Sequence, residues 1–387
     1  MKRYFPLILL TVAGFTFNTS ELTPIGLLSD IASDFNISEA AAGMMITIYA
    51  WVVALCSLPL MLWCAHMDFR KLMMVVIAVF CISHLGSVLA TGFMTLMVSR
   101  IGVALAHSIF WSIAPAMAVS VSPDGKRSTA LSALVAGGGV ALVAGLPLGR
   151  VLGLLAGWRA TFGVLGLLAF LVLVLFYISF PAIPKQESDE SRGHILKDII
   201  HSKPLLMIYL ITAVMITGHY TGYSYIEPLM DSVLHIESQA ITLTLSLFGV
   251  AGLAGSMLMS RYFPRYRRSI IGATCLGLPL VMLLLMPGAR LGVIALAVLC
   301  SLWGLAITIY NIAFQSEIIA YSSGNSAVAM SIYSGIFNLG IGGGAFVGGY
   351  VVRSGNLAFI PYVGGCIALS AAIYVLTRYL VLSGYHK

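Results

Sequence analysis

One acidic and one basic side chain lie deep inside apolar stretches of this sequence. Glu21, in the stretch TFNTSELTPIGLL, lies about 25 Å along an apolar segment that begins near Tyr4, at 1.5 Å per helical residue. Arg100 lies about five residues into a later apolar stretch. Because unpaired charges are costly in such surroundings, we predict that the two pair, and that protonation of Glu21 releases Arg100 during proton coupling. The simpler alternative makes Glu21 a static residue near the end of its segment.

A histidine and a tryptophan follow Arg100 on the same stretch. His107 and Trp111 are one helical turn apart and therefore share a face. A tryptophan ring stacks on the apolar face of a sugar and its indole N–H donates to hydroxyls, so Trp111 is the predicted contact for a pyranose. A histidine that bonds a neighbouring helix and a tryptophan that only packs remain equally good interpretations.

A second aromatic stretch, HYTGYSYIEP, carries His219, Tyr220, Tyr223 and Glu227. His219, Tyr223 and Glu227 follow one another at intervals of one turn and roughly share a face. We predict that the histidine and the two tyrosines contact the substrate. Glu227 stands beside Pro228 near the outer end of its segment, where a gating role is the better prediction.

Neutral amides and hydroxyls recur in other apolar segments, at Asn18, Asn311, Gln315, Tyr333 and Asn338. They suit an uncharged, polyhydroxylated substrate, because a site built to bind hydroxyls leaves polar groups unpaired with molecules that lack them. Each amide taken alone is explained equally well as a hydrogen bond between helices. Their joint occurrence favours a substrate site.

The composition identifies the elements that must position these residues. The chain is 59% hydrophobic and 9% charged, with a mean hydropathy of +0.99, whereas a soluble domain carries about 25% charged residues. Runs of 18 or more apolar residues can cross a bilayer as helices. We predict twelve such runs, near 4–28, 42–64, 72–91, 94–118, 129–155, 160–180, 204–229, 239–261, 269–287, 291–314, 326–351 and 357–382.

Lysine and arginine predict the orientation. If the N-terminus is cytoplasmic, the inner segments hold sixteen basic residues and the outer segments or helix ends hold four, Arg150, Arg159, Arg290 and Arg353. The positive-inside rule therefore places both termini in the cytoplasm. The net charge of +7 follows from this topology and indicates no nucleic-acid partner.

The chain divides at a long polar interruption. We predict a six-helix bundle over residues 1–180, a cytoplasmic linker over 181–203 and a second six-helix bundle over 204–387. An alignment at an offset of 199 residues pairs Gly145 with Gly344 and Gly149 with Gly348. Such a repeat is typical of secondary transporters whose halves alternate access to a midplane site, although shared glycine-rich composition is the other explanation.

Several strings carry a family resemblance: LTPIGLLSDIASDFNIS, IYAWVVALCSLPL, SRIGVALAHSIFWSIAPA, GLPLGRVLGLLAGWRATF, HYTGYSYIEP and SGIFNLGIGGGAFVG. Together with twelve spans and a central linker, they resemble the major facilitator superfamily over nearly the whole chain. Within it they resemble the bacterial sugar efflux transporters of the arabinose and isopropyl-thiogalactoside exporter type, in the twelve-span drug:proton antiporter group. The resemblance implies an all-α membrane protein of two pseudo-symmetric six-helix bundles, and it alone supplies the direction of transport.

The loop between the second and third runs departs from the family pattern. LWCAHMDFRKL keeps only Arg70 and Lys71 of the usual basic residues, and Asp68 is displaced from the usual acidic position. We retain Arg70 and Lys71 as predicted gating residues, while a gating role for the acid is doubtful.

Glycines and a proline mark the fifth run, GGGVALVAGLPLG. Glycines let helices approach closely, and Pro147 interrupts the backbone hydrogen bonds. The resemblance implies an antiporter motif and a gating role for Pro147, whereas close packing explains the same residues without antiport.

The sequence lacks the motifs that identify several other classes of protein. The sequence has no GxxxxGK[ST] phosphate loop and no HExxH or GxSxG motif, and its six cysteines show no CxxC spacing. We therefore predict no enzyme activity, no cofactor and no metal site.

These inferences lead to one prediction: a monomeric, multi-pass transporter of the bacterial inner membrane that exports small sugars or sugar analogues by proton antiport. Its partners are the sugar, protons and membrane lipid. The alternatives are a multidrug:proton antiporter and a non-transporting sensor on the same fold.

Overall fold

The computed structural model describes residues 4–64, 67–122, 127–181, 201–322 and 326–379. The described residues are almost entirely helical and contain no strand. Contacts group the chain into two compact units. Unit 1 comprises Met1–Ile37 and Ile48–Ser188, and unit 2 comprises Ser38–Thr47 and Asp189–Lys387. Most of the predicted linker, residues 182–200, lies outside the described residues.

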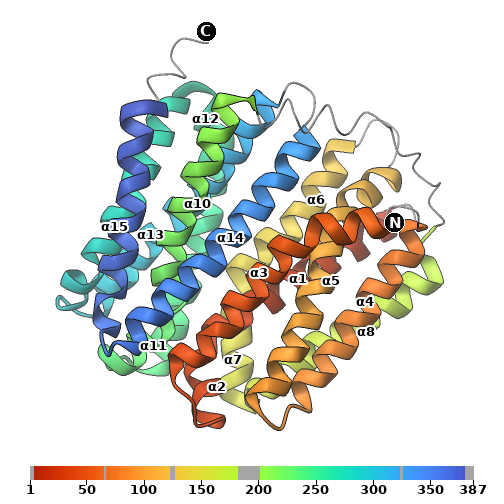
Figure 1. Ribbon diagram of the computed structural model, residues 1–387, viewed down its shortest axis with the longest axis horizontal. Coiled ribbons are helices and arrows are strands. Elements are labelled where there is room, and N and C mark those ends of the chain that lie inside the picture. The colour runs from red at the N-terminus through yellow and green to blue at the C-terminus, as the bar shows by residue number, and fades with distance from the viewer. Residues whose placement is uncertain (1–3, 65–66, 123–126, 182–200, 323–325, 380–387) are drawn as a thin grey trace. The chain divides into compact units, whose positions relative to one another are not determined.

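The described part of the first half consists of successive helices (Figure 1). They are α1 (Phe5–Gly26), α2 (Leu28–Asp34), α3 (Glu39–Cys64), α4 (Phe69–Val88), α5 (Phe93–Ser120), α6 (Arg127–Val140), the π-helix η2 (Ala141–Gly145), α7 (Leu146–Ala156) and α8 (Trp158–Ser179). Asp68 begins α4 by accepting a hydrogen bond from the Lys71 amide at 2.9 Å. Gly157, at a φ of +82°, makes the turn between α7 and α8 that a side chain would strain.

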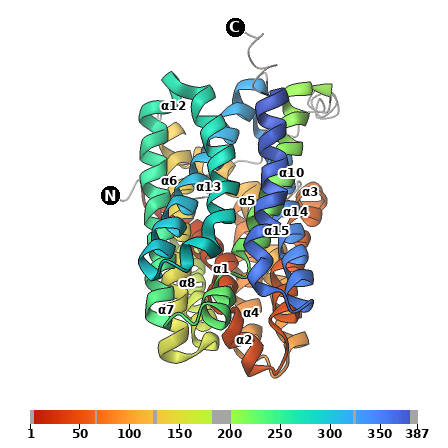
Figure 2. The same ribbon diagram turned by 90° about the vertical axis from the view of Figure 1, so that its left-hand side faces the viewer.

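The second half contains α10 (Lys203–Tyr223), α11 (Ile226–Pro228), the π-helix η3 (Leu229–Val233), α12 (Ser238–Ala289), α13 (Val293–Tyr321), α14 (Ser326–Arg353), the 3₁₀-helix η4 (Leu357–Phe359), α15 (Ile360–Tyr374) and the π-helix η5 (Val375–Tyr379). Within unit 2, α10 packs against both α14 and α15, as Figures 1 and 2 show from two sides.

Eleven helical segments among the described residues are long and apolar enough to cross a membrane. Lipid offers no hydrogen bonds to the backbone, so apolar runs of this length must satisfy their amides internally as helices. The run predicted at 129–155 is continuous helix but consists of three pieces, α6, η2 and α7. Pro147 is the second residue of α7, two positions after η2, and the wider π-turn accommodates a residue that has no amide hydrogen to donate.

The runs predicted at 239–261 and 269–287 correspond to two helices that can each span a membrane, Ser238–Met259 and Arg265–Ala289. Both carry the label α12, Ser238–Ala289, because they join at a kink, where Tyr266 has non-helical backbone angles of φ −121° and ψ 29°. The cluster of arginines in this stretch predicted the break between the two spans, because charged residues usually lie outside the membrane. These side chains lie at the kink, on helical backbone around Tyr266.

The glycines aligned between the two halves perform the same packing role in each unit. In unit 1, Gly145 and Gly149 lie against threonine side chains of α1, Thr19 and Thr23 respectively. In unit 2, Gly344 and Gly348 lie against the backbone of α10 around Thr221. In each unit a glycine-rich helix therefore approaches the first helix of its half closely enough to exclude side chains.

Candidate functional site

A buried polar cluster in unit 1 centres on Ser20 of α1. Arg100 of α5 donates from Nη1 to the Ser20 hydroxyl at 3.1 Å and from Nη2 to the Ser20 carbonyl at 3.0 Å. Nε2 of His84, on α4, lies 3.0 Å from the same hydroxyl. Because the hydroxyl accepts from Arg100, its own proton is available to His84. Ser20 thus holds a cation and an imidazole from two other helices.

Glu21, the next residue of α1, points to a second histidine. Its Oε2 lies 3.7 Å from Nε2 of His107, and Nδ1 of His107 lies 2.9 Å from the hydroxyl of Tyr49 on α3. The side chain of Glu21 is 19% exposed, whereas His107 and Tyr49 are buried. A carboxylate, an imidazole and a phenol therefore form a row of groups able to exchange protons.

The direct pairing expected between Glu21 and Arg100 is not present. No ion pair within 4 Å joins these side chains in the described part of the chain, and Arg100 is held by Ser20 instead. Consecutive residues of a helix point about 100° apart, so Ser20 and Glu21 cannot both face Arg100. The two groups belong to one cluster but contact different partners, Ser20 for Arg100 and His107 for Glu21.

Aromatic rings enclose the Arg100 guanidinium. Its central carbon lies 4.6 Å from the ring centroid of Tyr49 and 5.5 Å from that of Phe162 on α8. Arg100 is 1% exposed, and cation–π contacts compensate part of its lost hydration. The arginine is therefore a fixed positive charge inside unit 1.

Trp111 and Asn18, predicted separately, bond to each other. The Trp111 indole N–H donates to Oδ1 of Asn18 at 3.1 Å, from α5 to α1. Gly138 of α6 lies close to the Asn18 amide, and a methyl group there would come within 2.6 Å of Nδ2 and displace it. Trp111 is only partly buried, so its ring and the Asn18 amide remain accessible for a ligand.

In unit 2, the predicted aromatic residues of α10 form a packed cluster. Nδ1 of His219 accepts from the indole N–H of Trp303 on α13 at 2.9 Å. The His219 ring stacks on Tyr223 at 5.1 Å and meets Tyr220 edge-on at 4.8 Å. Trp303 has an exposed fraction of 0%, so this cluster is part of the interior of unit 2.

The amides of unit 2 form a smaller hydrogen-bonded group. Oδ1 of Asn311 accepts from Nε2 of Gln315 at 2.8 Å and from the Tyr333 hydroxyl at 3.0 Å, joining α13 to α14. Asn338 is separate and donates to the Ser334 carbonyl at 3.0 Å, and its Oδ1 is buried without a hydrogen-bond partner in the described structure. Three of the four predicted residues are therefore brought together.

The residues predicted to gate lie at three separate places, in the first turn of α4, in α7 and in α11. Nη2 of Arg70 donates to the Tyr177 carbonyl at 2.9 Å, and Lys71 extends from the first turn of α4 with an exposed side chain. Pro147 is buried in α7, and Glu227 is buried in α11.

Some members of these clusters were not predicted. His84, Ser20 and Tyr49 complete the unit 1 cluster, and Trp303 anchors the aromatic cluster. His84 could have been found, because a histidine inside an apolar run is the signal that identified His107. Serine, tyrosine and tryptophan occur in many spans as packing residues and give no comparable signal.

An ion pair on the other unit was also missed. Arg267 of α12 pairs with Glu317 of α13, and the Tyr321 hydroxyl lies 3.4 Å from Nη2 of Arg267. Glu317 is 1% exposed at its side chain, so the carboxylate depends on this arginine for its solvation. Among the described residues, no group of three or more His, Cys, Asp or Glu side chains could hold a metal ion.

Comparison with known proteins identifies the family. The family model described as Major Facilitator Superfamily matches residues 8–323. This range covers most of the chain. The chain belongs to the major facilitator superfamily. It is accordingly an all-α, multi-pass membrane protein with a transporter fold.

Solved structures of the superfamily share the fold at low identity. A D-xylose–proton symporter is 17% identical with a TM-score of 0.76, covering 96% of each chain. A bacterial homologue of the human lysosomal transporter Spinster, inward-facing and unoccupied, is 16% identical with a TM-score of 0.73, covering 97% of this chain and 95% of the other. A peptide transporter in complex with alafosfalin is 12% identical with a TM-score of 0.75, covering 98% and 94%.

Proposed function

We propose that this major facilitator protein is a proton-coupled efflux transporter. It exports small sugars or sugar analogues, such as arabinose or thiogalactosides, across the bacterial inner membrane by alternating access, as a monomer with two six-helix bundles. The observation that supports this most is the cluster in which Glu21 and His107 lie beside an arginine held by Ser20.

The proton step uses the difference in accessibility between the two charged groups. Glu21 is partly exposed and can exchange a proton, whereas Arg100 is buried and keeps its charge. An ionised Glu21 is stabilised by the nearby positive charge, and protonation removes that attraction. Loading and unloading one proton therefore changes the electrostatic balance of unit 1, and Tyr49 transmits the change through its contacts with His107 and Arg100.

The sugar step uses hydrogen bonds that a hydroxyl can replace. Asn18 with Trp111, and Asn311 with Gln315, offer donors and acceptors on partly exposed side chains, and the buried Tyr333 hydroxyl donates to Asn311. Asn338 adds an acceptor oxygen without a hydrogen-bond partner among the described residues. We propose that His219, Tyr220 and Tyr223 support the substrate contacts of unit 2 by packing, and that Arg70, Lys71, Pro147 and Glu227 gate access for the substrate.

Transport by the purified protein in liposomes tests the proposal. Labelled arabinose or a thiogalactoside is supplied with and without an imposed proton gradient, for wild type, Glu21→Gln and Glu237→Gln. Glu237 is an exposed carboxylate just before α12 and serves as the matched control. We expect gradient-driven accumulation by wild type and Glu237→Gln, and none by Glu21→Gln. Full accumulation by Glu21→Gln would remove this carboxylate from coupling.

A multidrug:proton antiporter is the second candidate, and the partly exposed ring of Trp111, beside the rings of His107 and Phe110, favours it. Such rings bind lipophilic cations. If neither sugar moves but a lipophilic cation is transported with the gradient, the substrate is a drug-like cation. If ligands bind without any flux, the protein is a sensor on this fold.

A further inference from the structure

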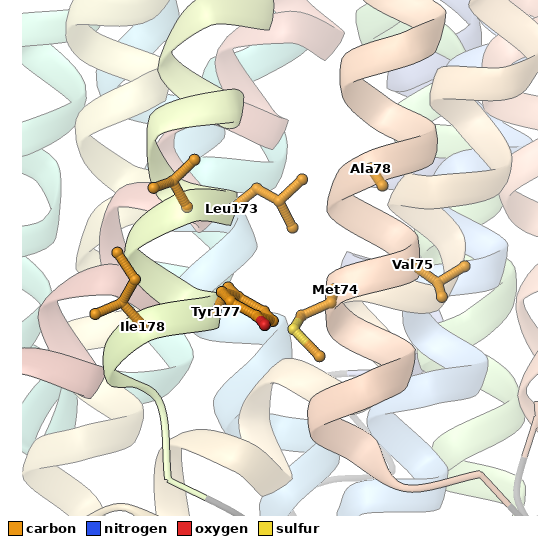
Figure 3. Close-up of a pocket in the computed structure, with 7 residues that line it drawn as sticks. Met74, Val75, Ala78, Leu173, Tyr177 and Ile178 are labelled. Carbon is orange, nitrogen blue, oxygen red and sulfur yellow. The ribbon is translucent and has the colours of Figure 1, made fainter.

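A groove of about 590 Å³ runs between α4 and α8, which pack side by side in unit 1 (Figure 3). Its walls are apolar almost throughout, with Met74, Val75 and Ala78 from α4 and Leu173, Tyr177 and Ile178 from α8. None of these residues belongs to the polar clusters described above. The groove is therefore separate from the candidate transport site.

The groove faces the hydrocarbon of the membrane. Both of its helices are candidate spans, and Val75, Tyr177 and Ile178 are exposed over half or more of their surface. Apolar side chains exposed on a spanning helix contact lipid tails. An apolar recess open to lipid between two such helices suits a single acyl chain.

Basic and aromatic residues lie at one end of the groove. Arg70 precedes Met74 by one turn of α4, and its Nη2 donates to the carbonyl of Tyr177, which itself lines the groove. Lys71 is exposed beside it. The nearby Asp68 carboxylate accepts the Lys71 amide and so is engaged at the start of the helix. A positive charge next to a tyrosine is the arrangement found where spans meet lipid headgroups.

We propose that this groove binds one phospholipid with an anionic headgroup, placing an acyl chain between α4 and α8 and its phosphate on Arg70. The charge decides the class of lipid, because a guanidinium forms paired hydrogen bonds to phosphate oxygens. In the predicted orientation the lipid belongs to the cytoplasmic leaflet. This inference is independent of the transported substrate.

Native mass spectrometry of the full chain in detergent tests the headgroup. Phosphatidylglycerol and phosphatidylcholine with identical acyl chains are titrated against wild type, Arg70→Gln and Arg261→Gln, the last removing an exposed arginine of unit 2. One basic residue near a membrane surface strengthens anionic lipid binding by about fivefold. We expect Arg70→Gln to lose about that factor for phosphatidylglycerol and Arg261→Gln to lose none. Equal binding of both lipids by wild type, or equal loss in both variants, overturns the proposal.

A second pair of variants tests the acyl chain. Ala78→Phe fills the groove, whereas Val79→Phe enlarges an exposed neighbour that does not line it. We expect Ala78→Phe to lower phosphatidylglycerol binding at least fivefold and Val79→Phe to leave it unchanged. If Ala78→Phe instead changes only the oligomeric state, a second copy occupies the groove and the lipid proposal fails.

Discussion

Ser20 has a small side chain that holds two longer ones, those of Arg100 and His84, by hydrogen bonds. Ser20→Ala removes the acceptor of Arg100 Nη1 and the partner of His84 Nε2, both in buried surroundings. Buried donors left unpaired cost about 1–3 kcal/mol, so we expect the free energy of unfolding to fall by that amount. Unfolding of the purified protein in detergent measures it.

Ser87→Ala is the control for this change. Ser87 is equally buried, but its hydroxyl donates to the Ser83 carbonyl of its own helix. Removing it leaves no buried charge or ring unpaired, so the loss should stay below about 1 kcal/mol. Equal losses in the two variants would mean that Ser20 has no special part in holding Arg100.

Trp111 and Asn18 share one hydrogen bond, which makes a double-mutant cycle informative. Trp111→Phe keeps an aromatic ring and removes the indole N–H, and Asn18→Leu removes the acceptor. If both contact the sugar, each should raise the KM for transport about fivefold or more, and the double variant should raise it by less than the product. Trp158→Phe is the control, because the Trp158 indole N–H has no partner among the described residues. Purely multiplicative effects would show that the two residues act independently.

Residue types predicted part of the site and helix rotation decided the rest. Glu21, Arg100 and His107 could be identified because charges and histidines are costly in apolar runs. The contacts among these residues could not be predicted, because Ser20 and Glu21 differ by one position and face different neighbours. The rotation of α1 that decides this comes from packing against α5 through Phe17 and Phe110, whose rings stack at 4.3 Å.

At the scale of helices, adjacent glycines of α14 give a sharp comparison. A methyl group on Gly344 would lie 2.5 Å from the Thr217 carbonyl and 2.8 Å from the Thr221 amide of α10, whereas one on Gly343 would lie 3.4 Å from a threonine hydroxyl. Gly344→Ala must therefore separate α10 from α14, while Gly343→Ala fits with little change. We expect a loss of about 1–3 kcal/mol for the first and under about 1 for the second, by unfolding in detergent. Equal stability of the two variants would contradict this packing.

The predicted elements agree with the structure where the signal is hydropathy and differ where it is backbone detail. Apolar length predicted nearly every span, because a spanning segment has no alternative to a helix. The π-turn before Pro147 leaves no mark in composition. The arginines at 261–268 marked the break between two spans, but the chain turns there at a kink around Tyr266 without an extended loop, since arginine has a high helix propensity.

For the whole molecule, the basic residues predict a testable topology. An alkaline phosphatase reporter, which is active only outside the cytoplasm, should be active when inserted at Gly92 and inactive when fused after Lys387. Gly92 lies in the turn between α4 and α5 with open space around it, so an insertion is tolerated there. A fluorescent protein fused after Lys387 should be fluorescent. The opposite pattern at both sites would place the termini outside and reverse the leaflet of the proposed lipid.

The division of the molecule was predicted from one polar stretch and a weak repeat. The packing of glycines on the first helix of each half follows the aligned positions, since the same close approach requires the same residue. The grouping of Ser38–Thr47 with unit 2 could not be read from hydropathy, because one uninterrupted helix carries residues of both units.

The helical backbone on both sides of the kink in α12 changes how a protease would meet this protein. Proteases cut exposed, extended segments, and trypsin cuts after arginine or lysine. Arg261, Arg265 and Arg268 are exposed, yet all three lie on helical backbone on either side of the bend at Tyr266. The most arginine-rich stretch of the chain should therefore resist trypsin as long as the protein is folded, and cleavage there would report the moment at which α12 comes apart.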